Sequence, residues 1–267
     1  MKPIIIANWK MKLGHKESID LANKLQNGLI KEYGNLYDRI VAIKNRWAEN
    51  LDLVLCPSFI SVNAVHKRII GSGIKLGAQD VFWEEKGAYT GEIAVSMLKE
   101  VKVEYVIVGH SERRRYLNET DEMIHKKLKL LAEEKITPIL CIGETFDERT
   151  ANQKDYVIVR QLIKALEGIK FLDDQKLIIA YEPIWVIGTG QAVEPEEANL
   201  SAKMIKTALL DIFSQKFIDN NIKVIYGGSV SSKDAKDFLS QENIDGALIG
   251  TASWNAEEFL RIINQCK

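Results

Sequence analysis

The 267-residue sequence contains little cysteine, with residues only at positions 56, 141 and 266 and no Cys-x-x-Cys spacing. An odd number of widely separated cysteines argues against a disulfide framework and a cysteine-based zinc site, and it favours a reducing compartment. Neither sign of charge is in excess, because 36 Lys and Arg residues stand against 37 Asp and Glu residues. This balance does not support a nucleic-acid or membrane partner, so any affinity for phosphate must come from a local site.

Long apolar stretches are also missing. None approaches the roughly 20 residues that a membrane-spanning helix needs, and the apolar run at residues 3–7 is too short for the core of a secretion signal. We therefore expect a soluble, cytoplasmic protein. The apolar fraction of 46% allows a sizeable core, but a chain of this length fits either two small domains or one large barrel.

What the sequence does contain is a series of eight short apolar runs, continuous and rich in β-branched residues. They lie at residues 4–6, 53–56, 74–76, 105–108, 138–141, 177–180, 224–226 and 247–249. Such runs are typical of parallel strands covered on both faces. Segments with helical spacing, such as 121–135 and 196–213, separate most of them. The pattern predicts one α/β domain over residues 1–267, a (β/α)8 TIM barrel, in preference to an open doubly wound sheet.

Polar side chains follow these runs directly. Asn8 and Lys10 follow the first run, His110 follows the fourth, and Glu182 follows the sixth. The carboxyl ends of the strands carry the chemistry in this type of barrel, so the four side chains are expected at one mouth. Three of them have an ordinary alternative when taken alone: a solvated lysine, a histidine that caps or lines a turn, and a loop acid. Their joint placement favours a site.

Two glycine-containing segments, residues 227–229 and 250–251, follow the last two runs. Barrels of this type commonly bind phosphate at this place, through backbone N–H groups and the start of a short helix. Glycines after strands are also common turns, so each segment alone is weak support.

Two further features are expected to have a structural role. Cys141 should be a core thiol, and the three arginines at residues 113–115 should be a solvated or salt-bridged helix start.

The stretch "AYEPIWVIGTG" at residues 180–190 combines an acid at the end of a strand with a loop that is both apolar and glycine-rich. A surface loop is ordinarily polar, so this composition calls for another explanation.

Seven motifs, in order along nearly the whole chain, resemble those of the triosephosphate isomerase family. They are "ANWKM" (7–11), "GAQDVFWEEKGAYTGE" (77–92), "VIVGHSERR" (106–114), "CIGE" (141–144), "AYEPIWVIGTG" (180–190), "YGGSV" (226–230) and "DGALIGTAS" (245–253). The resemblance implies interconversion of dihydroxyacetone phosphate and D-glyceraldehyde 3-phosphate, without a metal or a cofactor.

The resemblance also implies a role for each mouth residue. Glu182 would be the base that removes the proton beside the carbonyl, and His110 the electrophile that polarises the carbonyl. Lys10 would supply positive charge and Asn8 a hydrogen bond. Donors aimed at the developing enediolate oxygen lower the barrier to removing such a weakly acidic proton. Ser111 starts a helix after His110, and its positive end would disfavour the imidazolium form.

By the same resemblance, the phosphate would meet backbone N–H groups at Gly188, Ser229, Gly250 and Thr251. Residues 183–185 would be the first hinge of a lid, and residues 188–190 would be the part that closes on the substrate and excludes water from Glu182. Tyr226 and Ser229 would hold the closed lid. Because threonine is a poor choice for positive φ, we expect Thr251 to have negative φ at the start of a short helix.

The resemblance further implies a homodimer through the loop at residues 79–91, in which Thr90 supports Asn8 and Glu112 of the partner.

Three departures from the family pattern stand out. Residues 31–51 form a longer segment than usual, for which we expect a longer or additional helix on the outer ring. The lid carries Val186 and Gln191 where the family often has alanine and lysine, and Thr251 replaces a usual glycine. The alternative function is an inactive barrel that retains phosphate-ligand binding, but such a relative is expected to have lost one of the four mouth residues.

Overall fold

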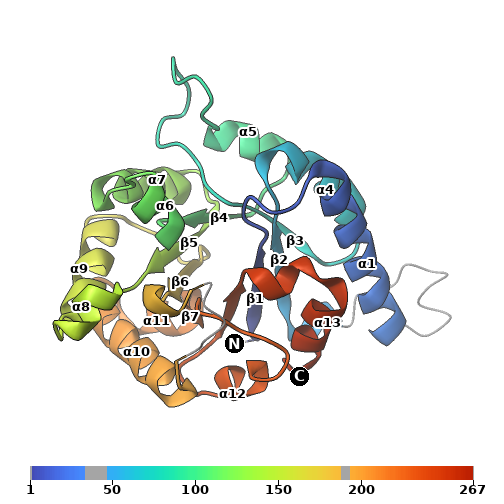
Figure 1. Ribbon diagram of the computed structural model, residues 1–267. Helices are drawn as coiled ribbons and strands as arrows, with labels where there is room; N and C mark the ends of the chain where they lie inside the picture. The colour runs from blue at the N-terminus through green and yellow to red at the C-terminus, as the bar shows by residue number, and fades with distance from the viewer. Residues whose placement is uncertain (1, 34–46, 188–192, 267) are drawn as a thin grey trace.

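The computed structural model describes residues 2–33, 47–187 and 193–266. Within these residues, eight parallel strands form a closed barrel in which each strand pairs with its sequence neighbours and β1 closes on β8 (Figure 1). The predicted (β/α)8 TIM barrel is therefore confirmed. The strands are β1 (Ile4–Asn8), β2 (Asp52–Cys56), β3 (Lys75–Ala78), β4 (Tyr105–Val108), β5 (Thr137–Ile142), β6 (Leu177–Tyr181), β7 (Ile222–Tyr226) and β8 (Gly246–Ile249).

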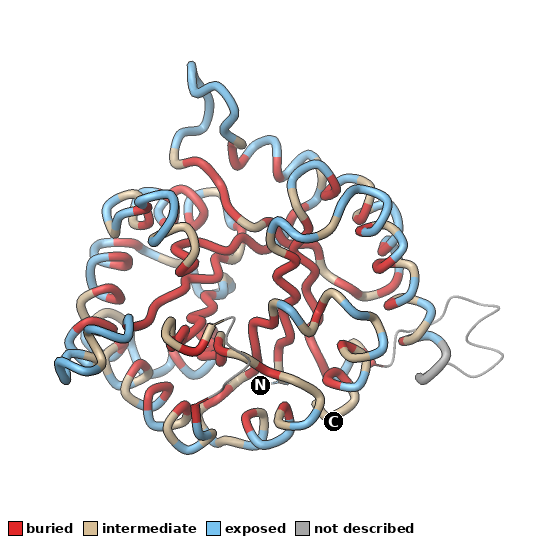
Figure 2. The backbone as a smooth tube through the Cα atoms, viewed as in Figure 1, coloured by how far each residue is buried: buried red, intermediate tan, exposed pale blue. Residues whose placement is uncertain are grey.

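Helices lie outside the barrel, and Figure 2 shows their outer faces exposed while the strands are buried. The α-helices are α1 (His15–Tyr33), α3 (Trp47–Asn50), α4 (Val62–Ile69), α5 (Val95–Glu100), α6 (Ser111–Tyr116), α7 (Asp121–Glu133), α8 (Phe146–Thr150), α9 (Lys154–Leu166), α10 (Pro195–Ala208), α11 (Gln215–Asn221), α12 (Ala235–Leu239) and α13 (Ala256–Asn264). Short 3-10 turns are η1 (Phe59–Ser61), η2 (Ile184–Val186), η3 (Leu209–Asp211) and η4 (Thr251–Trp254).

Local sequence accounts for the helix ends. Thr120 caps α7 by accepting the backbone N–H of Met123, and Lys135 follows the helix with a φ of 58°. The predicted helix at 121–135 is thus confirmed to within two residues. The prediction of one helix at 196–213 is wrong at its end, because α10 stops at Ala208 and a 3-10 turn follows.

The core has two layers, separated by the strands. The inner layer fills the barrel and includes residues of every strand except β3, such as the alternate residues Ile4 and Ile6 of β1. The outer layer, with Ile5 and Ala7, packs against the helices. Cys141 is fully buried in the inner layer, as expected of a core thiol, and burial raises its pKa well above the ordinary value.

The additional helix expected at residues 31–51 falls mostly on residues 34–46, which lie outside the described residues. On the two sides of this gap, α1 runs to Tyr33 and α3 begins at Trp47, whose side chain is buried in the outer core. Among the described helices, none is long and apolar enough to cross a membrane.

Candidate active site

Three strand ends bring four of the predicted residues to the carboxyl mouth of the barrel. Asn8 is the last residue of β1, His110 lies just after β4, and Glu182 directly follows β6. All three side chains are buried, and Glu182 is only 1% exposed. Lys10 lies two residues after β1 and is partly buried. A carboxylate, an imidazole, an amide and a cation therefore meet where the fold places its chemistry.

Lys10 has an unusual backbone that its neighbours hold in place. Its φ is 51°, in the left-handed region that few non-glycine residues adopt. The backbone N–H donates to Asn8 Oδ1 at 3.0 Å, and the carbonyl accepts Gln79 Nε2 at 3.0 Å. The ammonium Nζ lies 2.6 Å from Glu112 Oε1. These contacts direct the lysine across the mouth towards α6.

The tautomer of His110 follows from its hydrogen bonds. Its Nδ1 accepts the backbone N–H of Glu112 at 3.2 Å, as the N-cap of α6. An accepting Nδ1 carries no proton, so the proton of a neutral ring lies on Nε2. The helix predicted to start after His110 is present as α6, and the contact of Nδ1 with its first turn leaves Nε2 as the free edge of a ring that lines the mouth.

Glu182 is held beside that donor. Its Oε2 accepts the backbone N–H of Ser111 at 2.9 Å, and its Oε1 lies 3.3 Å from His110 Nε2 without hydrogen-bond alignment. Two glycines leave room for it: a Cβ on Gly143 would lie 1.7 Å from the Glu182 carbonyl oxygen, and one on Gly227 would lie 2.9 Å from its Cγ. The carboxylate is thus packed tightly at its base and meets two N–H groups at its tip.

A cavity of about 510 Å³ opens in front of these groups. Asn8, Lys10 and His110 line one side, and the ends of β7 and β8 line the other. Glu182 does not line it, since the carboxylate lies behind against Ser111. The lining residues from β7 and β8 include Gly227, Gly228, Ser229, Gly250 and Thr251, as the phosphate prediction requires.

The two residues after β8 have different backbones. Gly250 has φ −88° and ψ −101°, and a Cβ there would lie 3.1 Å from Lys10 Cε. Thr251 is the first residue of η4 and is not among the residues with positive φ, so the prediction for its backbone is confirmed. Tyr226 is buried, and its hydroxyl would lie 2.2 Å from a Cβ on Gly228.

The start of the predicted lid packs on a network that the sequence did not reveal. Trp185 Nε1 donates to Glu144 Oε1 at 2.9 Å, and the Arg149 guanidinium lies 4.3 Å from the Trp185 ring. Burial raises the pKa of Glu144 above its usual value. Ser229 Oγ donates to the carbonyl of the buried Val186 at 3.2 Å. Gly188 and Gln191 lie outside the described residues.

The loop at 79–91 begins on a buried ionic network. Asp80 accepts Lys127 at 2.7 Å and Arg113 at 2.8 Å, and both cations also contact Glu119. Burial raises the pKa of Asp80 to about 6. The arginine run is therefore salt-bridged at its first member, as expected.

Beyond this root the loop projects from the barrel before α5 (Figures 1 and 2). The Phe82 ring stacks on Trp83 at 4.1 Å and packs near Tyr89 at 4.6 Å, and residues 84–92 are exposed, Thr90 among them. Met11, beside Lys10, is 99% exposed. Met11 was not predicted as a residue of interest, although the sequence itself shows an apolar residue directly beside the lysine at the barrel mouth.

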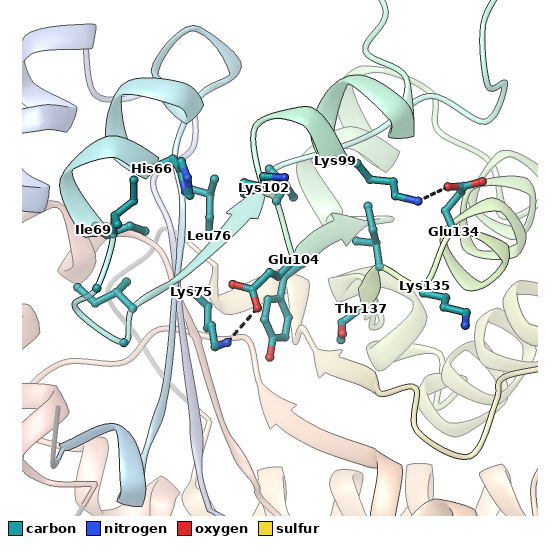
Figure 3. A pocket seen from close by; sticks show the side chains of 17 residues that line it. His66, Ile69, Lys75, Leu76, Lys99, Lys102, Glu104, Glu134, Lys135 and Thr137 are labelled. Carbon is teal, nitrogen blue, oxygen red and sulfur yellow. Dashed lines mark hydrogen bonds and ion pairs between the residues drawn. The ribbon is translucent and has the colours of Figure 1, made fainter. Parts of the chain in front are cut away.

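A larger hollow of about 720 Å³ lies at the opposite end, where β3, β4 and β5 begin (Figure 3). Its acids are paired with lysines: Lys75 Nζ lies 2.9 Å from Glu104, and Lys99 Nζ lies 2.6 Å from Glu134. None of the predicted site residues lines it. Cavity volume alone therefore does not identify the active site, and the smaller cavity at the mouth is the better candidate. Among the described residues, no group of three or more His, Cys, Asp or Glu could hold a metal ion.

Comparison with known proteins adds an independent result. Residues 3–266 match the family model described as triosephosphate isomerase. The triosephosphate isomerase of Alkaliphilus oremlandii is 43% identical over 263 residues, which cover 98% of this chain and 99% of that protein. Those of Dictyoglomus turgidum and Clostridium botulinum (strain Langeland) are 41% and 42% identical, each over 98% of both chains.

Proposed function

The chain belongs to the triosephosphate isomerase family, and on that premise we propose that Glu182 and His110 interconvert dihydroxyacetone phosphate and D-glyceraldehyde 3-phosphate at this mouth. The observation that carries the proposal is the 3.3 Å approach of Glu182 Oε1 to His110 Nε2 beside a cavity that Lys10 and Asn8 also line. An acid–base pair next to a cation suits proton transfer beside a carbonyl.

Glu182 takes the proton. Its carboxylate leaves the Ser111 N–H and removes a proton from C1 of the ketone. The electron pair of that C–H bond forms the C1–C2 double bond, and the π electron pair of the C2 carbonyl moves onto its oxygen. The proton returns from Glu182 to C2, which gives the aldehyde. The carboxylate is only 1% exposed, so water is kept away from the proton while Glu182 carries it between the two carbons.

His110 and Lys10 stabilise the intermediate. The Nε2–H of the neutral imidazole donates to the oxygen that gains charge and moves protons between the two oxygens of the enediolate. Because Nδ1 is held as an acceptor, Nε2 is the nitrogen that can give up a proton to one oxygen and take one from the other. Lys10 adds a positive charge in a partly buried place, where an ionic interaction is stronger than in water. Asn8 supports it through the backbone hydrogen bond at 3.0 Å.

The phosphate group binds on the opposite side of the cavity. We place it against backbone N–H groups at Ser229, Gly250 and Thr251, with Gly188 of the lid as a further donor. Backbone donors at the start of η4 provide an anion site without a cluster of basic side chains. This arrangement fits a chain whose net charge is close to zero.

We further propose a homodimer formed through the loop at 79–91, with Thr90 reaching Asn8 and Glu112 of the partner. The support is the projecting loop itself together with the 99% exposed Met11, since an apolar side chain beside a catalytic lysine is covered at low cost by a second copy. We also propose that residues 1–267 form one domain with 31–51 as an outer-ring addition, and that the enzyme works in the cytoplasm.

A coupled assay of D-glyceraldehyde 3-phosphate isomerisation tests the function. The parent should be active, and Glu182→Gln should keep the fold and bind inorganic phosphate normally but lower kcat by at least about 10²-fold, the scale of losing a general base. Near-normal turnover of Glu182→Gln would remove this residue from the mechanism. An inactive parent that binds phosphate would instead indicate a binding-only barrel.

A further inference from the structure

A buried glutamine on α9 forms hydrogen bonds with the backbone just after the end of β5. Gln161 is 6% exposed and makes two hydrogen bonds with one residue, Gly143. Its Oε1 accepts the Gly143 N–H at 2.9 Å, and its Nε2 donates to the Gly143 carbonyl at 3.2 Å. A side-chain amide carries a donor and an acceptor side by side, so it can serve both groups of one residue. The side chain therefore pairs with Gly143 as a neighbouring strand would.

The sheet itself explains why this partner is needed. The register between β4 and β5 ends at Val108 and Leu140, whereas β5 continues along β6 to Ile142. Gly143 lies beyond the end of the β4 ladder, so its N–H and carbonyl would otherwise be buried without a strand partner. Gln161 supplies both partners from the outer helix layer.

Gly143 also lies against the residue to which the proposed function assigns the proton transfer. A Cβ at position 143 would be 1.7 Å from the Glu182 carbonyl oxygen and 2.6 Å from the carbonyl carbon. The Glu182 N–H donates to the Ile142 carbonyl at 2.8 Å. The backbone of Glu182 is thus in direct contact with the peptide that Gln161 fixes, and a shift of one moves the other.

We infer that Gln161 is a positioning residue for Glu182, acting through Gly143; this inference rests on the proposed function. The carboxylate must travel between the Ser111 N–H and the substrate carbon while its backbone stays fixed. A displacement of about 1 Å in a reacting group costs on the order of 10²-fold in rate. Loss of the two hydrogen bonds from Gln161 allows such a displacement without changing any group that touches the substrate.

Two variants test the inference. Gln161→Met keeps the length of the side chain and removes both hydrogen bonds. Gln161→Glu keeps an acceptor for the Gly143 N–H and places a carboxylate against the Gly143 carbonyl, so it remains informative if the methionine variant folds poorly. Both should lower kcat about tenfold or more, while KM and the inhibition constant of inorganic phosphate change less than about threefold, because the phosphate site is separate.

A matched control lies on the outer ring. Asn221 is 8% exposed and donates to the carbonyls of Asp173 and Gln175, each at 2.7 Å. Asn221→Leu also removes two buried hydrogen bonds, but far from the mouth. It should lower the melting temperature by a similar few degrees and leave kcat within about twofold. Equal melting losses with an unchanged kcat in both Gln161 variants would overturn the inference.

A double-mutant cycle separates positioning from a general loss of activity. If Gln161 acts through the Glu182 carboxylate, Gln161→Met should change the residual rate of Glu182→Gln by less than about twofold. A full tenfold effect in that background would show that Gln161 acts elsewhere. Normal turnover by Glu182→Gln alone would contradict the role proposed for Glu182. This outcome is measured without any Gln161 variant, so it is distinguishable from a failure of the inference about Gln161.

Discussion

The indole N–H of Trp185 donates to the carboxylate of Glu144 across 2.9 Å, and this bond joins η2, where the proposed lid begins, to the end of β5. Glu144 is fully buried, and the hydroxyl of Tyr181 contacts both of its oxygens at 3.2 Å. The proposed hinge is therefore tied to the same strand end that Gln161 contacts through Gly143.

Trp185→Phe should weaken the hinge. The variant keeps an aromatic ring for Arg149 but removes one donor to a buried carboxylate, which costs about 1.5–3 kcal/mol. We expect kcat to fall several-fold and more inorganic phosphate to be released per turnover, because a poorly held lid exposes the enediolate to elimination. Phosphate release and isomerisation are measured on the same samples.

Tyr181→Phe provides the control for this prediction. It also removes a donor to Glu144, but Tyr181 belongs to β6 and not to the lid. The stability loss should be similar, and the fraction of turnovers that end in phosphate release should stay at the level of the parent. If both variants release phosphate in the same fraction of turnovers, the effect comes from the unpaired charge of Glu144 and not from the lid.

Asp52 at the opposite end of the barrel predicts a pH-dependent stability. Burial alone would raise its pKa, but hydrogen bonds and charges from Lys2 and Lys223 outweigh it and lower the pKa below the ordinary 3.8. Lys223 is 4% exposed and lies 3.2 Å from Asp52 Oδ2. A lowered pKa means that the ion pair stabilises the fold above about pH 4 and that this contribution is lost as the pH falls through the folded-state value.

Asp52→Asn should therefore lower the free energy of unfolding by about 2–4 kcal/mol near pH 7, because it leaves Lys223 buried without its charge partner. The difference from the parent should narrow as the pH falls below 4 in urea titrations. Glu104→Gln breaks the exposed pair with Lys75 at 2.9 Å and should cost less than about 1 kcal/mol at any pH. A difference between Asp52→Asn and the parent that stays constant from pH 7 to pH 3 would contradict the assignment.

The sequence predicted the barrel and its mouth because both depend on a regular rule. Parallel strands repeat as apolar runs, and their carboxyl ends meet at one edge, so Asn8, His110 and Glu182 could be placed together without coordinates. Glu144 follows β5 and obeys the same rule, and its link to Trp185 could have been suspected.

Gln161 was not predictable in this way. It occupies an interior helix position where a glutamine is ordinarily solvated, and its role depends on how α9 packs against a strand end 18 residues earlier. The lengths of α10 and η3 depend similarly on packing, since the helical spacing continues to residue 213 while the helix ends at Ala208. Tertiary contacts decide such features, and local pattern does not contain them.

Met11→Asp tests the proposed dimer. The side chain is 99% exposed, so the change leaves the fold of one subunit intact, but it buries a charge if a second copy covers this face. We expect sedimentation to show monomers at concentrations where the parent is dimeric, with lower activity. Leu200→Asp on the outer ring, 64% exposed in the parent, should stay dimeric and active. A fully active monomeric parent would contradict the dimer.

Gly250 and Thr251 are adjacent, and we expect them to differ in how well they tolerate substitution. At Gly250 a Cβ would lie 3.1 Å from Lys10 Cε, closer than ordinary contact, and the backbone at φ −88° and ψ −101° is outside the regions that side chains prefer. Gly250→Ala should displace Lys10 and lower kcat/KM about tenfold or more. At Thr251 the proposed phosphate contact uses only the backbone N–H, and φ is not positive.

Thr251→Gly should therefore change kcat/KM by less than about threefold, or roughly 0.6 kcal/mol. The inhibition constant of inorganic phosphate should rise in Gly250→Ala and stay within threefold in Thr251→Gly, because the first change moves a cation and the second moves no donor. A tenfold gain in phosphate affinity from Thr251→Gly would mean that the threonine side chain obstructs the site. If kcat/KM and the inhibition constant of inorganic phosphate are unchanged in Gly250→Ala, then Lys10 can shift by a few tenths of an ångström without changing its interaction with the substrate.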